Sequence, residues 1–512
     1  VAVHNSSSVV DTLDGSTNSV FLLFIYLTSS LSNCQFIFTD VDYAVARTGS
    51  GAWTNPVRIQ PASSAPASNV DVIIRNVNLH GSGGTAVAGF HILFIDSTTS
   101  DFTNLNVVLH NVRLNVHTTS GNNRLVRVRV NSLTNCNFDL KDIDYRAYAN
   151  AYNRFLYLDW ITSTDTTFTV DNAVYDAHSI TGVSKFVAFF ADSSLTMLRT
   201  HFVFTNLNAT IFTGATSTKK AWFWDAENHV TMTDSSVQIG SNAGGASHAD
   251  ILATDTDVDT AFIGATGGLT ATGSHFSVEN MVVKCAGESM VNLRSAVLSG
   301  SSSLRFSQVH MEHVGTISAG DRVFFALSSA SLSTTRIDFS GIVTATTITN
   351  PIVLVETLNT TMSSSHLRIA QAARSSMLNS NGEYFHHRHR FGSLASSEIA
   401  FTNCNLQSLG FSSMAITGPS TLALTNVHVT NGVTFSSLSH LELTATVTGG
   451  SLTDAILVDS STVQSLTLNT SSLSINSKTT VQVPVSFINS AIGTLDLRFH
   501  ALTYTHQGPT GT

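Results

Sequence analysis

The sequence contains few cysteines, few prolines and few charged residues for its length. Four Cys in 512 residues are too few for a disulfide framework, and seven Pro leave no proline-rich hinge that would divide the chain into domains. Charged residues make up 12% of the chain, the formal net charge is -9, and Lys is scarce. Nucleic acid binding requires a basic stripe that neutralises phosphates. We therefore expect no nucleic acid partner and no electrostatic anchor on a membrane surface.

Long hydrophobic runs are also absent. The longest apolar run covers residues 20–27, whereas a helix needs about 20 residues to span a bilayer. No long stretch has the 3.6-residue apolar period of a helix, and no helix caps are recognisable. We therefore expect no membrane-spanning segment and almost no helix. Because the first residue is Val rather than Met, we expect a mature or excised form, or part of a longer chain.

The sequence does contain a repeat of about 30 residues along its whole length. Asn33-Cys34 precedes an Asp-x-Asp-Tyr segment at residues 40–43, and Asn135-Cys136 precedes the same pattern at residues 142–145. The two copies are about three repeats apart. A fixed period in this range indicates a solenoid, a propeller or an array.

Each repeat reads as short strands. An apolar run that ends in a Ser/Thr-rich turn, such as FLLFIYLTSS from Phe21, is followed by an alternating segment such as VVLHNVRLNV from Val107. Alternation at period two is typical of a strand with one buried face, and Val, Ile, Phe and Thr favour strands. The apolar runs start roughly 29–38 residues apart as far as Tyr384 and roughly 22–28 residues apart beyond it.

These patterns predict an all-β fold, a single long right-handed parallel β-helix (solenoid) of about 15–16 coils of roughly 22–38 residues. Residues 1–512 would form one continuous β-helix, with longer coils in 1–400 and shorter coils and a C-terminal tail in 401–512. Phe190 and Phe325 would point inward. The main alternative is a propeller, but its blades need about 40–45 residues and four antiparallel strands.

Five asparagines share the local pattern apolar-x-Asn-x-x-apolar: Asn76, Asn111, Asn135, Asn403 and Asn426. A tight bend leaves buried backbone groups that need partners, and an amide side chain offers both donors and an acceptor. We therefore expect an inward stack of Asn side chains at a bend between strands. The alternative is that Asn is common at exposed turns.

The coil pattern and this Asn position resemble the right-handed parallel β-helix proteins of the pectin-lyase-like superfamily. Within that group, IIRNVNLHG from Ile73 and LTNVHVTNG from Leu424 resemble the repeats of the dispersed-gene-family surface proteins of trypanosomatids. The cysteine-rich segments associated with that surface family are absent. This resemblance implies a cell-surface or extracellular protein with an adhesive or structural role.

The sequence contains no recognisable set of catalytic residues. The motif sets of polygalacturonases and pectate lyases do not occur together, and no cofactor is expected. Asp255, Asp257 and Asp259 alternate in ATDTDVDT and are candidate Ca²⁺ ligands, unless they are simply solvated charges at an edge. On a strand, His386, Arg388 and Arg390 would share one face, as a contact patch or as part of a bulge where the repeat shortens. N-glycosylation acceptor sequences lie at Asn5, Asn208, Asn359 and Asn469.

Two functions remain open. The first is an extracellular or cell-surface structural or adhesive solenoid that assembles end to end into a filament or forms part of a longer surface protein. Its partners would be further copies of itself, other surface proteins or glycans. The alternative is a carbohydrate-active β-helix enzyme, a polysaccharide lyase or hydrolase. A groove with two carboxylates, or a carboxylate and an Arg or Lys, from adjacent coils would favour the enzyme.

Overall fold

The computed structural model describes residues 2–506 except 14–19, 28–29, 48–52, 62–63, 84–88, 120, 150–151, 180–181, 190–193, 215–219, 227, 242–245, 254–258, 266, 287–288, 315–321, 347–351, 371–372, 375–384, 391, 430–431 and 478–483. The described residues form strands and turns and contain no helix. This agrees with the predicted all-β class. The described part of the chain accordingly offers no helix with the length and hydropathy needed to cross a membrane.

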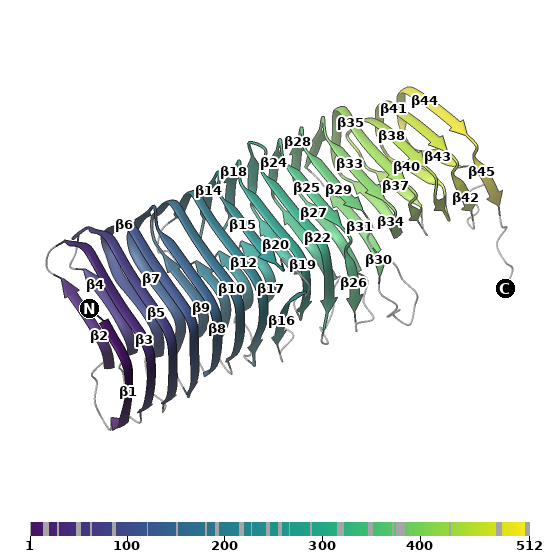
Figure 1. Cartoon of the computed structure of the whole chain (residues 1–512). Coiled ribbons are helices and arrows are strands. Elements are labelled where there is room, and N and C mark those ends of the chain that lie inside the picture. The colour runs from purple at the N-terminus through teal and green to yellow at the C-terminus, as the bar shows by residue number, and fades with distance from the viewer. Residues whose placement is uncertain are drawn as a thin grey trace. The chain divides into compact units, whose positions relative to one another are not determined.

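The strands are numbered in chain order (Figure 1). The first group is β1 (Ala2–Leu13), β2 (Val20–Leu27), β3 (Leu31–Arg47), β4 (Trp53–Pro61), β5 (Ala67–Gly83), β6 (Gly89–Thr118), β7 (Asn122–Thr134), β8 (Asn137–Ala149), β9 (Tyr152–Asp159), β10 (Thr162–Ser179), β11 (Val183–Phe189), β12 (Leu195–Thr213), β13 (Lys220–Ala226), β14 (Val230–Thr233), β15 (Ser236–Gly240), β16 (Ser247–Ala253), β17 (Asp259–Ala265), β18 (Leu269–Thr272), β19 (His275–Cys285), β20 (Ser289–Arg294), β21 (Val297–Ser299) and β22 (Ser303–His313).

The second group is β23 (Arg322–Ser328), β24 (Ser331–Ser333), β25 (Arg336–Ser340), β26 (Val343–Thr346), β27 (Ile352–Leu358), β28 (Thr361–Ser363), β29 (His366–Ala370), β30 (Ala373–Arg374), β31 (Phe385–Arg390), β32 (Ser393–Ala395), β33 (Glu398–Thr402), β34 (Asn405–Ser412), β35 (Ala415–Thr425), β36 (His428–Val429), β37 (Val433–Ser436), β38 (His440–Thr448), β39 (Ser451–Leu452), β40 (Ile456–Asp459), β41 (Thr462–Ser471), β42 (Ser474–Ser477), β43 (Val485–Ile488), β44 (Ala491–His500) and β45 (Thr503–His506).

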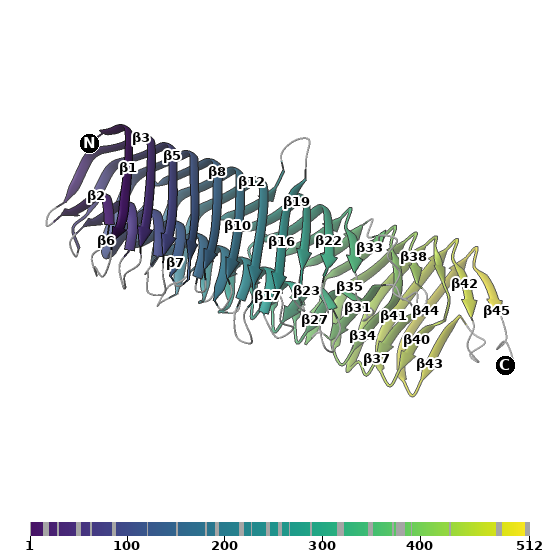
Figure 2. The same ribbon diagram turned by 90° about the horizontal axis from the view of Figure 1, so that it is seen from below.

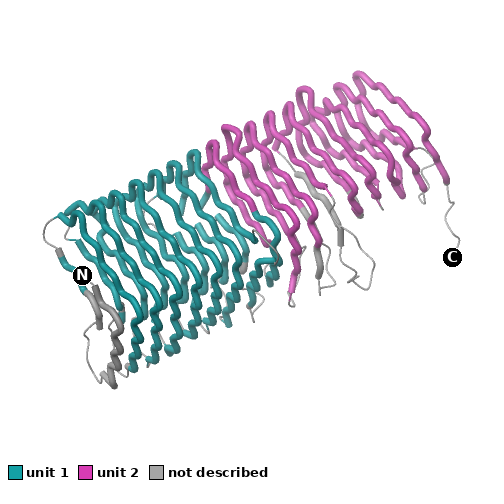
Figure 3. Tube along the Cα trace, in the orientation of Figure 1, with its two compact units in different colours: residues 1–268, 278–287, 315–317 teal, residues 269–277, 288–314, 318–512 magenta. Residues whose placement is uncertain are grey.

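The chain divides into two compact units (Figure 3). Unit 1 consists of residues 1–268, 278–287 and 315–317. Unit 2 consists of residues 269–277, 288–314 and 318–512. The predicted continuity of one element over residues 1–512 therefore stays a prediction.

In unit 1 each strand pairs in parallel with the equivalent strand of the next repeat. Strands β3, β5, β6, β8, β10 and β12 follow one another in this way, so that Phe138 is the register partner of Phe168 and Phe168 that of Phe202. Figure 2 shows strands of this series side by side. The described strands lack the antiparallel pairing that a propeller requires, so the repeating parallel arrangement is compatible with the parallel β-helix class.

Unit 2 has the same parallel pairing with shorter repeats. Hydrogen-bonded partners are 32 residues apart between Ser365 and Ser397 but 23 apart between Ser397 and Ser420. Ala370 and Phe385 have the register partners Thr402 and Leu406, so the fourteen residues from 371 to 384 correspond to only the three from 403 to 405 in the next repeat. The predicted shortening beyond residue 400 thus comes from a shorter connection at this point of the repeat. The spacing widens again to 29 between Ser461 and Ser490.

The interior is filled by stacked side chains from successive repeats. The rings of Phe138 and Phe168 have centroids 4.4 Å apart and are stacked, and Phe202 continues the column at 4.8 Å. In unit 2 the predicted inward residue Phe325 is buried, with its ring 4.1 Å from that of Phe339. Phe190 lies outside the described residues. Identical strand spacing in each repeat lets like residues stack, which is why aromatic residues recur at the repeat period.

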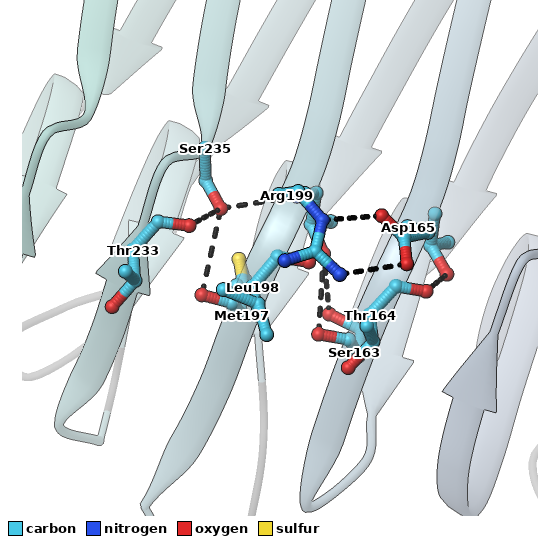
Figure 4. Close-up of polar contacts among 10 residues, drawn as sticks. Ser163, Thr164, Asp165, Met197, Leu198, Arg199, Thr233 and Ser235 are labelled. Carbon is cyan, nitrogen blue, oxygen red and sulfur yellow. Dashed lines mark hydrogen bonds and ion pairs between the residues drawn. The ribbon is translucent and has the colours of Figure 1, made fainter.

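Buried hydroxyl groups line one inner corner of each unit. In unit 1 the backbone N–H of Thr200 donates to Oγ of Ser235, and that hydroxyl donates to the carbonyl of Thr233 (Figure 4). In unit 2 the N–H of Thr335 donates in the same way to Oγ of Ser365. Short hydroxyl side chains therefore satisfy backbone groups that the bend removes from the strand ladder. The abundance of Ser and Thr is in part an interior feature.

Candidate functional site

The predicted Asn stack exists as a hydrogen-bonded ladder, but it lies outside the core. Asn76, Asn111, Asn135, Asn403 and Asn426 are all exposed, and each has a φ of 51–53°. The left-handed conformation is costly for most residues and tolerated by Asn and Asp. The expectation of an inward stack is therefore wrong. Asn occupies these corners because its backbone adopts positive φ, while Ser and Thr satisfy the buried groups.

The five asparagines belong to separate ladders. Nδ2 of Asn111 donates to Oδ1 of Asn76 at 2.8 Å, and Nδ2 of Asn426 donates to Asn403 at 3.3 Å. Asn135 lies on another corner of unit 1, where it donates to Asn104 at 2.6 Å. In later repeats of the same corner, a contact between Arg and Asp replaces the contact between two Asn side chains. Arg199 donates two hydrogen bonds to Asp165, at 2.6 and 2.9 Å (Figure 4).

The glycosylation acceptors differ in accessibility. Asn208 on β12 and Asn359 after β27 are exposed, and Asn359 occupies a corner with a φ of 51°. Asn469 is half-buried within β41, between the register partners Thr446 and Arg498. Asn5 is a strand residue of β1, and its side chain lies outside the described part. Asn208 and Asn359 are therefore the more accessible acceptors among the described residues.

The other predicted sites lie largely outside the described part of the chain. Asp255 and Asp257 are not among the described residues, and neither is the side chain of Asp259 at the start of β17. The described residues contain no group of three His, Cys, Asp or Glu that could hold a metal ion. His386, Arg388 and Arg390 lie on β31, which pairs with β27 and β34 with a register shift on each side; their side chains are not described.

All four cysteines are free thiols, and Cys136, Cys285 and Cys404 are buried. Burial raises the pKa of the Cys136 thiol to about 11. Cys34 and Cys136 belong to equivalent positions three repeats apart, as their shared Asn-Cys pattern predicts. Cys136 therefore behaves as a small buried hydrophobic residue.

The last described repeat of unit 2 has an open edge. Strands β43, β44 and β45 pair with β40, β41 and β42 on one side, and no described strand pairs with their other side (Figure 1). Strand N–H and C=O groups at such an edge can pair with another strand. The edge therefore offers a backbone template for association.

This open edge also exposes apolar side chains. Leu466 and Leu468 on β41 are 2% exposed, whereas their register partners on β44, Leu495 and Leu497, are each 37% exposed. Ile492 and Phe499 on the same strand are also exposed. These residues continue columns that are buried in the preceding repeat. They remain exposed because no described strand covers them.

The edge carries little net charge. The two ionised side chains of β44 are Asp496 and Arg498, which form an ion pair at 2.7 Å. The Asp496 carboxylate raises the pKa of Arg498. Because these two charges are opposite and lie on the same strand, they largely cancel. They therefore oppose the approach of a second apolar surface less than two unpaired charges would.

Unit 1 carries an outward face of mixed charge. Arg58 on β4 contacts Asp96 on β6 at 2.9 Å, and Arg129 on β7 lies within 4 Å of both Asp96 and Asp159. These groups come from adjacent repeats, as the enzyme alternative requires. The apolar cavity of unit 1 between Phe38 and Ile92 holds only about 10 Å³ and is lined by no charged residue. It offers no room for a substrate.

A second outward face of unit 1 carries a row of aromatic rings. His117, Tyr148, His178 and Phe212 come from β6, β8, β10 and β12, and neighbouring rings have centroids 6.2, 4.8 and 5.2 Å apart. His117 and Tyr148 are exposed, and Tyr148 donates a hydrogen bond to Asp176 at 3.2 Å. Sequence reasoning missed this row because its members differ in residue type. Their equivalent position in each repeat was the signal that could have found it.

No protein-family model matches the chain, no curated protein matches it, and no solved structure matches it. The resemblance to trypanosomatid surface proteins therefore stays a prediction, and the parallel, repeating β fold is what the structure itself supports.

Proposed function

We propose that the protein is a structural or adhesive repeat protein of the cell surface or extracellular space, in which the repeats are coils of a right-handed parallel β-helix. The parallel pairing of equivalent strands in successive repeats supports this architecture, and parallel crossovers are nearly always right-handed. The resemblance to dispersed-gene-family surface proteins and the exposed acceptors Asn208 and Asn359 support the location. The aromatic row around Tyr148 is a suitable contact surface for other surface proteins or glycans.

The observation that carries the proposal is the apolar open edge formed by β43, β44 and β45. Leu495, Leu497 and Phe499 are exposed there beside strand groups that have no described partner. Pairing with a further strand would bury these side chains and complete the ladder. Such a contact between different surfaces of two copies is heterologous, so it builds open filaments when it does not close into a ring. The same edge would suit continuation of the repeats in a longer surface protein.

Sedimentation velocity over a wide concentration range tests the self-association. We expect the wild-type chain to form larger species as concentration rises, and Leu495→Lys to reduce this by placing a charge in the contact. Val297→Lys is the matched control, because Val297 is also exposed but lies on β21, away from the edge. A wild-type chain that stays monomeric at high concentration would contradict assembly through this edge.

One observation favours the second candidate function, a carbohydrate-active enzyme. Arg58, Asp96 and Arg129 bring a carboxylate and two guanidinium groups together from adjacent repeats. A hydrolase or lyase of acidic polysaccharides needs acid or base groups beside positive charge. Turnover of such a polysaccharide by the purified chain, abolished by Asp96→Asn, would transfer the proposal to this alternative.

A further inference from the structure

Lys185 is a buried lysine in a chain that contains few lysines. Among the lysines whose side chains the structure describes, Lys141 is exposed and Lys284 is half-buried, whereas Lys185 is fully covered. Its Nζ contacts Oδ2 of Asp225, and the side chain of Asp225 is also fully covered. An amine nitrogen and a carboxyl group therefore meet in a place that is closed to solvent.

The two side chains lie on the same face of neighbouring strands in unit 1. Lys185 on β11 is the register partner of Trp222 on β13. Phe223 and Trp224, the next two residues of β13, both pack against rings of the interior. Trp222 and Asp225, on either side of them, therefore share the opposite face of the strand. Lys185 lies on that face as well, because parallel register partners point to the same side.

An indole ring packs beside the pair. Trp222 is fully buried, and a Cβ atom at Gly264 would collide with its ring. Gly264 on β17 is the register partner of Asp225. The absence of a side chain at Gly264 thus makes room for the ring next to the carboxyl group. Ions in such a place lose the hydration that stabilises them in water.

The two groups contain every atom that an amide bond requires. A proton passes from Nζ to Oδ2, which leaves a neutral amine beside a carboxylic acid. The nitrogen lone pair then attacks Cγ, the carbon that carries Oδ2, so that a C–N bond forms and a C–O bond breaks. The oxygen leaves as water with two of the three ammonium protons, and the third stays on the amide nitrogen. No oxidant or further reactant is needed.

Burial favours the amide over the ion pair. In water an ammonium group and a carboxylate are strongly hydrated, so exposed pairs of Lys and Asp remain ionised. Lys185 and Asp225 lack contact with solvent, and an amide carries no charge that needs hydration. The fold also holds the amine against one carboxyl group, which turns an encounter between two molecules into a reaction within one chain.

We propose that Lys185 and Asp225 condense after folding to an intramolecular amide bond, which joins β11 and β13 covalently. The two residues lie 40 positions apart in the chain, on successive repeats. The bond closes a loop, so it restricts the unfolded chain and keeps the two repeats together when the chain is pulled. It is independent of the open edge proposed for self-association.

Intact mass spectrometry of the full chain, produced in bacterial cells and unfolded for the measurement, tests the proposal. We expect the wild-type mass to be about 18 Da below the mass of the sequence, because one water is lost. Lys185→Met should show no deficit. Lys141→Met is the matched control and should keep the deficit, because Lys141 is exposed although its register partner, Asp171, is also an aspartate.

Tryptic digestion locates the lost water. Trypsin does not cleave after an acylated lysine, so we expect a branched peptide in which Nζ of Lys185 is joined to the side chain of Asp225. A cyclic imide formed at Asp225 also loses water, but its deficit would persist in Lys185→Met, and this result would overturn the proposal. A wild-type chain with the full mass of its sequence would overturn it too. That measurement remains decisive if a variant fails to fold.

Discussion

Asn111 donates a hydrogen bond from Nδ2 to Oδ1 of Asn76, 2.8 Å away and 35 residues earlier in the chain. Both residues have a φ of 52° and lie on the same exposed corner of unit 1. The contact shows that one Asn does two things at once. Its backbone turns the corner, and its side chain connects successive repeats.

Two substitutions of Asn111 separate these roles. Asn111→Gly removes the hydrogen bond but keeps easy access to positive φ, so it should cost less than about 1 kcal/mol at this exposed site. Asn111→Ala also forces a Cβ-bearing residue without a local amide into the left-handed region, which adds about 1–2 kcal/mol. Urea unfolding of both variants measures the order. A glycine variant less stable than the alanine variant would show that the side-chain hydrogen bond matters more to stability at this corner than the backbone conformation does.

The inward and outward positions of unit 2 should differ sharply in sensitivity. Phe325→Ala removes a ring packed between Phe306 and Phe339 and should cost about 3–5 kcal/mol. Ser331→Ala at an exposed position on β24 should change stability by less than about 0.5 kcal/mol. Because repeats contact mainly their neighbours, amide hydrogen exchange in β20, β23 and β27 is the suitable measurement. Equal loss of protection in the two variants would contradict the observed packing.

The buried pair Lys185–Asp225 should show strong coupling. Both side chains are fully covered, so Lys185→Met alone leaves a buried carboxylate and should cost about 3–5 kcal/mol. The double variant Lys185→Met/Asp225→Leu removes both charges and should be more stable than either single variant. A double-mutant cycle based on chemical unfolding measures this coupling. Additive single effects would show that the two charges do not depend on each other.

Alkaline stability should depend on Cys136. Its folded pKa is about 11, above the usual value of 9.0, because burial disfavours the thiolate. Well below pH 9 the thiol is protonated in both states and its contribution to stability is complete. As pH rises from 9 towards 11, the unfolded chain ionises first and stability falls, by up to about 3 kcal/mol.

The matched variant for this test is Cys136→Thr, because Thr166 occupies the equivalent position in the next repeat. We expect it to lose part of the alkaline slope while keeping stability near pH 7 within about 1 kcal/mol. The free energy of unfolding is compared at pH 7 and pH 10. If the free energy of unfolding has the same pH dependence in both proteins, ionisation of the Cys136 thiol does not contribute to the loss of stability at alkaline pH.

The fold class was predictable because each repeat has the same local sequence patterns. Alternation in segments such as residues 107–116 marks strands, and the Asn-Cys pattern at Cys34 and Cys136 marks the same point of the repeat. Parallel pairing aligns such equivalent positions. The shortening of the repeats beyond residue 400 was also visible, although its origin between Thr402 and Leu406, where three residues correspond to fourteen in the preceding repeat, was not.

The direction of the Asn side chains was not predictable from the same pattern. A residue at a bend points inward or outward according to its backbone conformation, and apolar-x-Asn-x-x-apolar fits both. The positive φ of Asn76 and its neighbours decides the matter. Hydroxyl residues such as Ser235, which accepts a hydrogen bond from the backbone N–H of Thr200, satisfy the buried backbone groups instead. In the sequence these residues are visible only as part of a general excess of Ser and Thr.

By itself the sequence determined the period, the strands and the parallel all-β class, because these follow from spacing and alternation along the chain. Only the tertiary structure decided which residues meet across repeats. His91, Arg124, Arg154 and Lys185 are 33, 30 and 31 residues apart, and the parallel pairing of β6, β7, β9 and β11 places them in one register. The same holds for Leu495 and Leu497, whose sequence is that of a buried strand. They are exposed because burial depends on whether another strand covers them, and no local pattern encodes that.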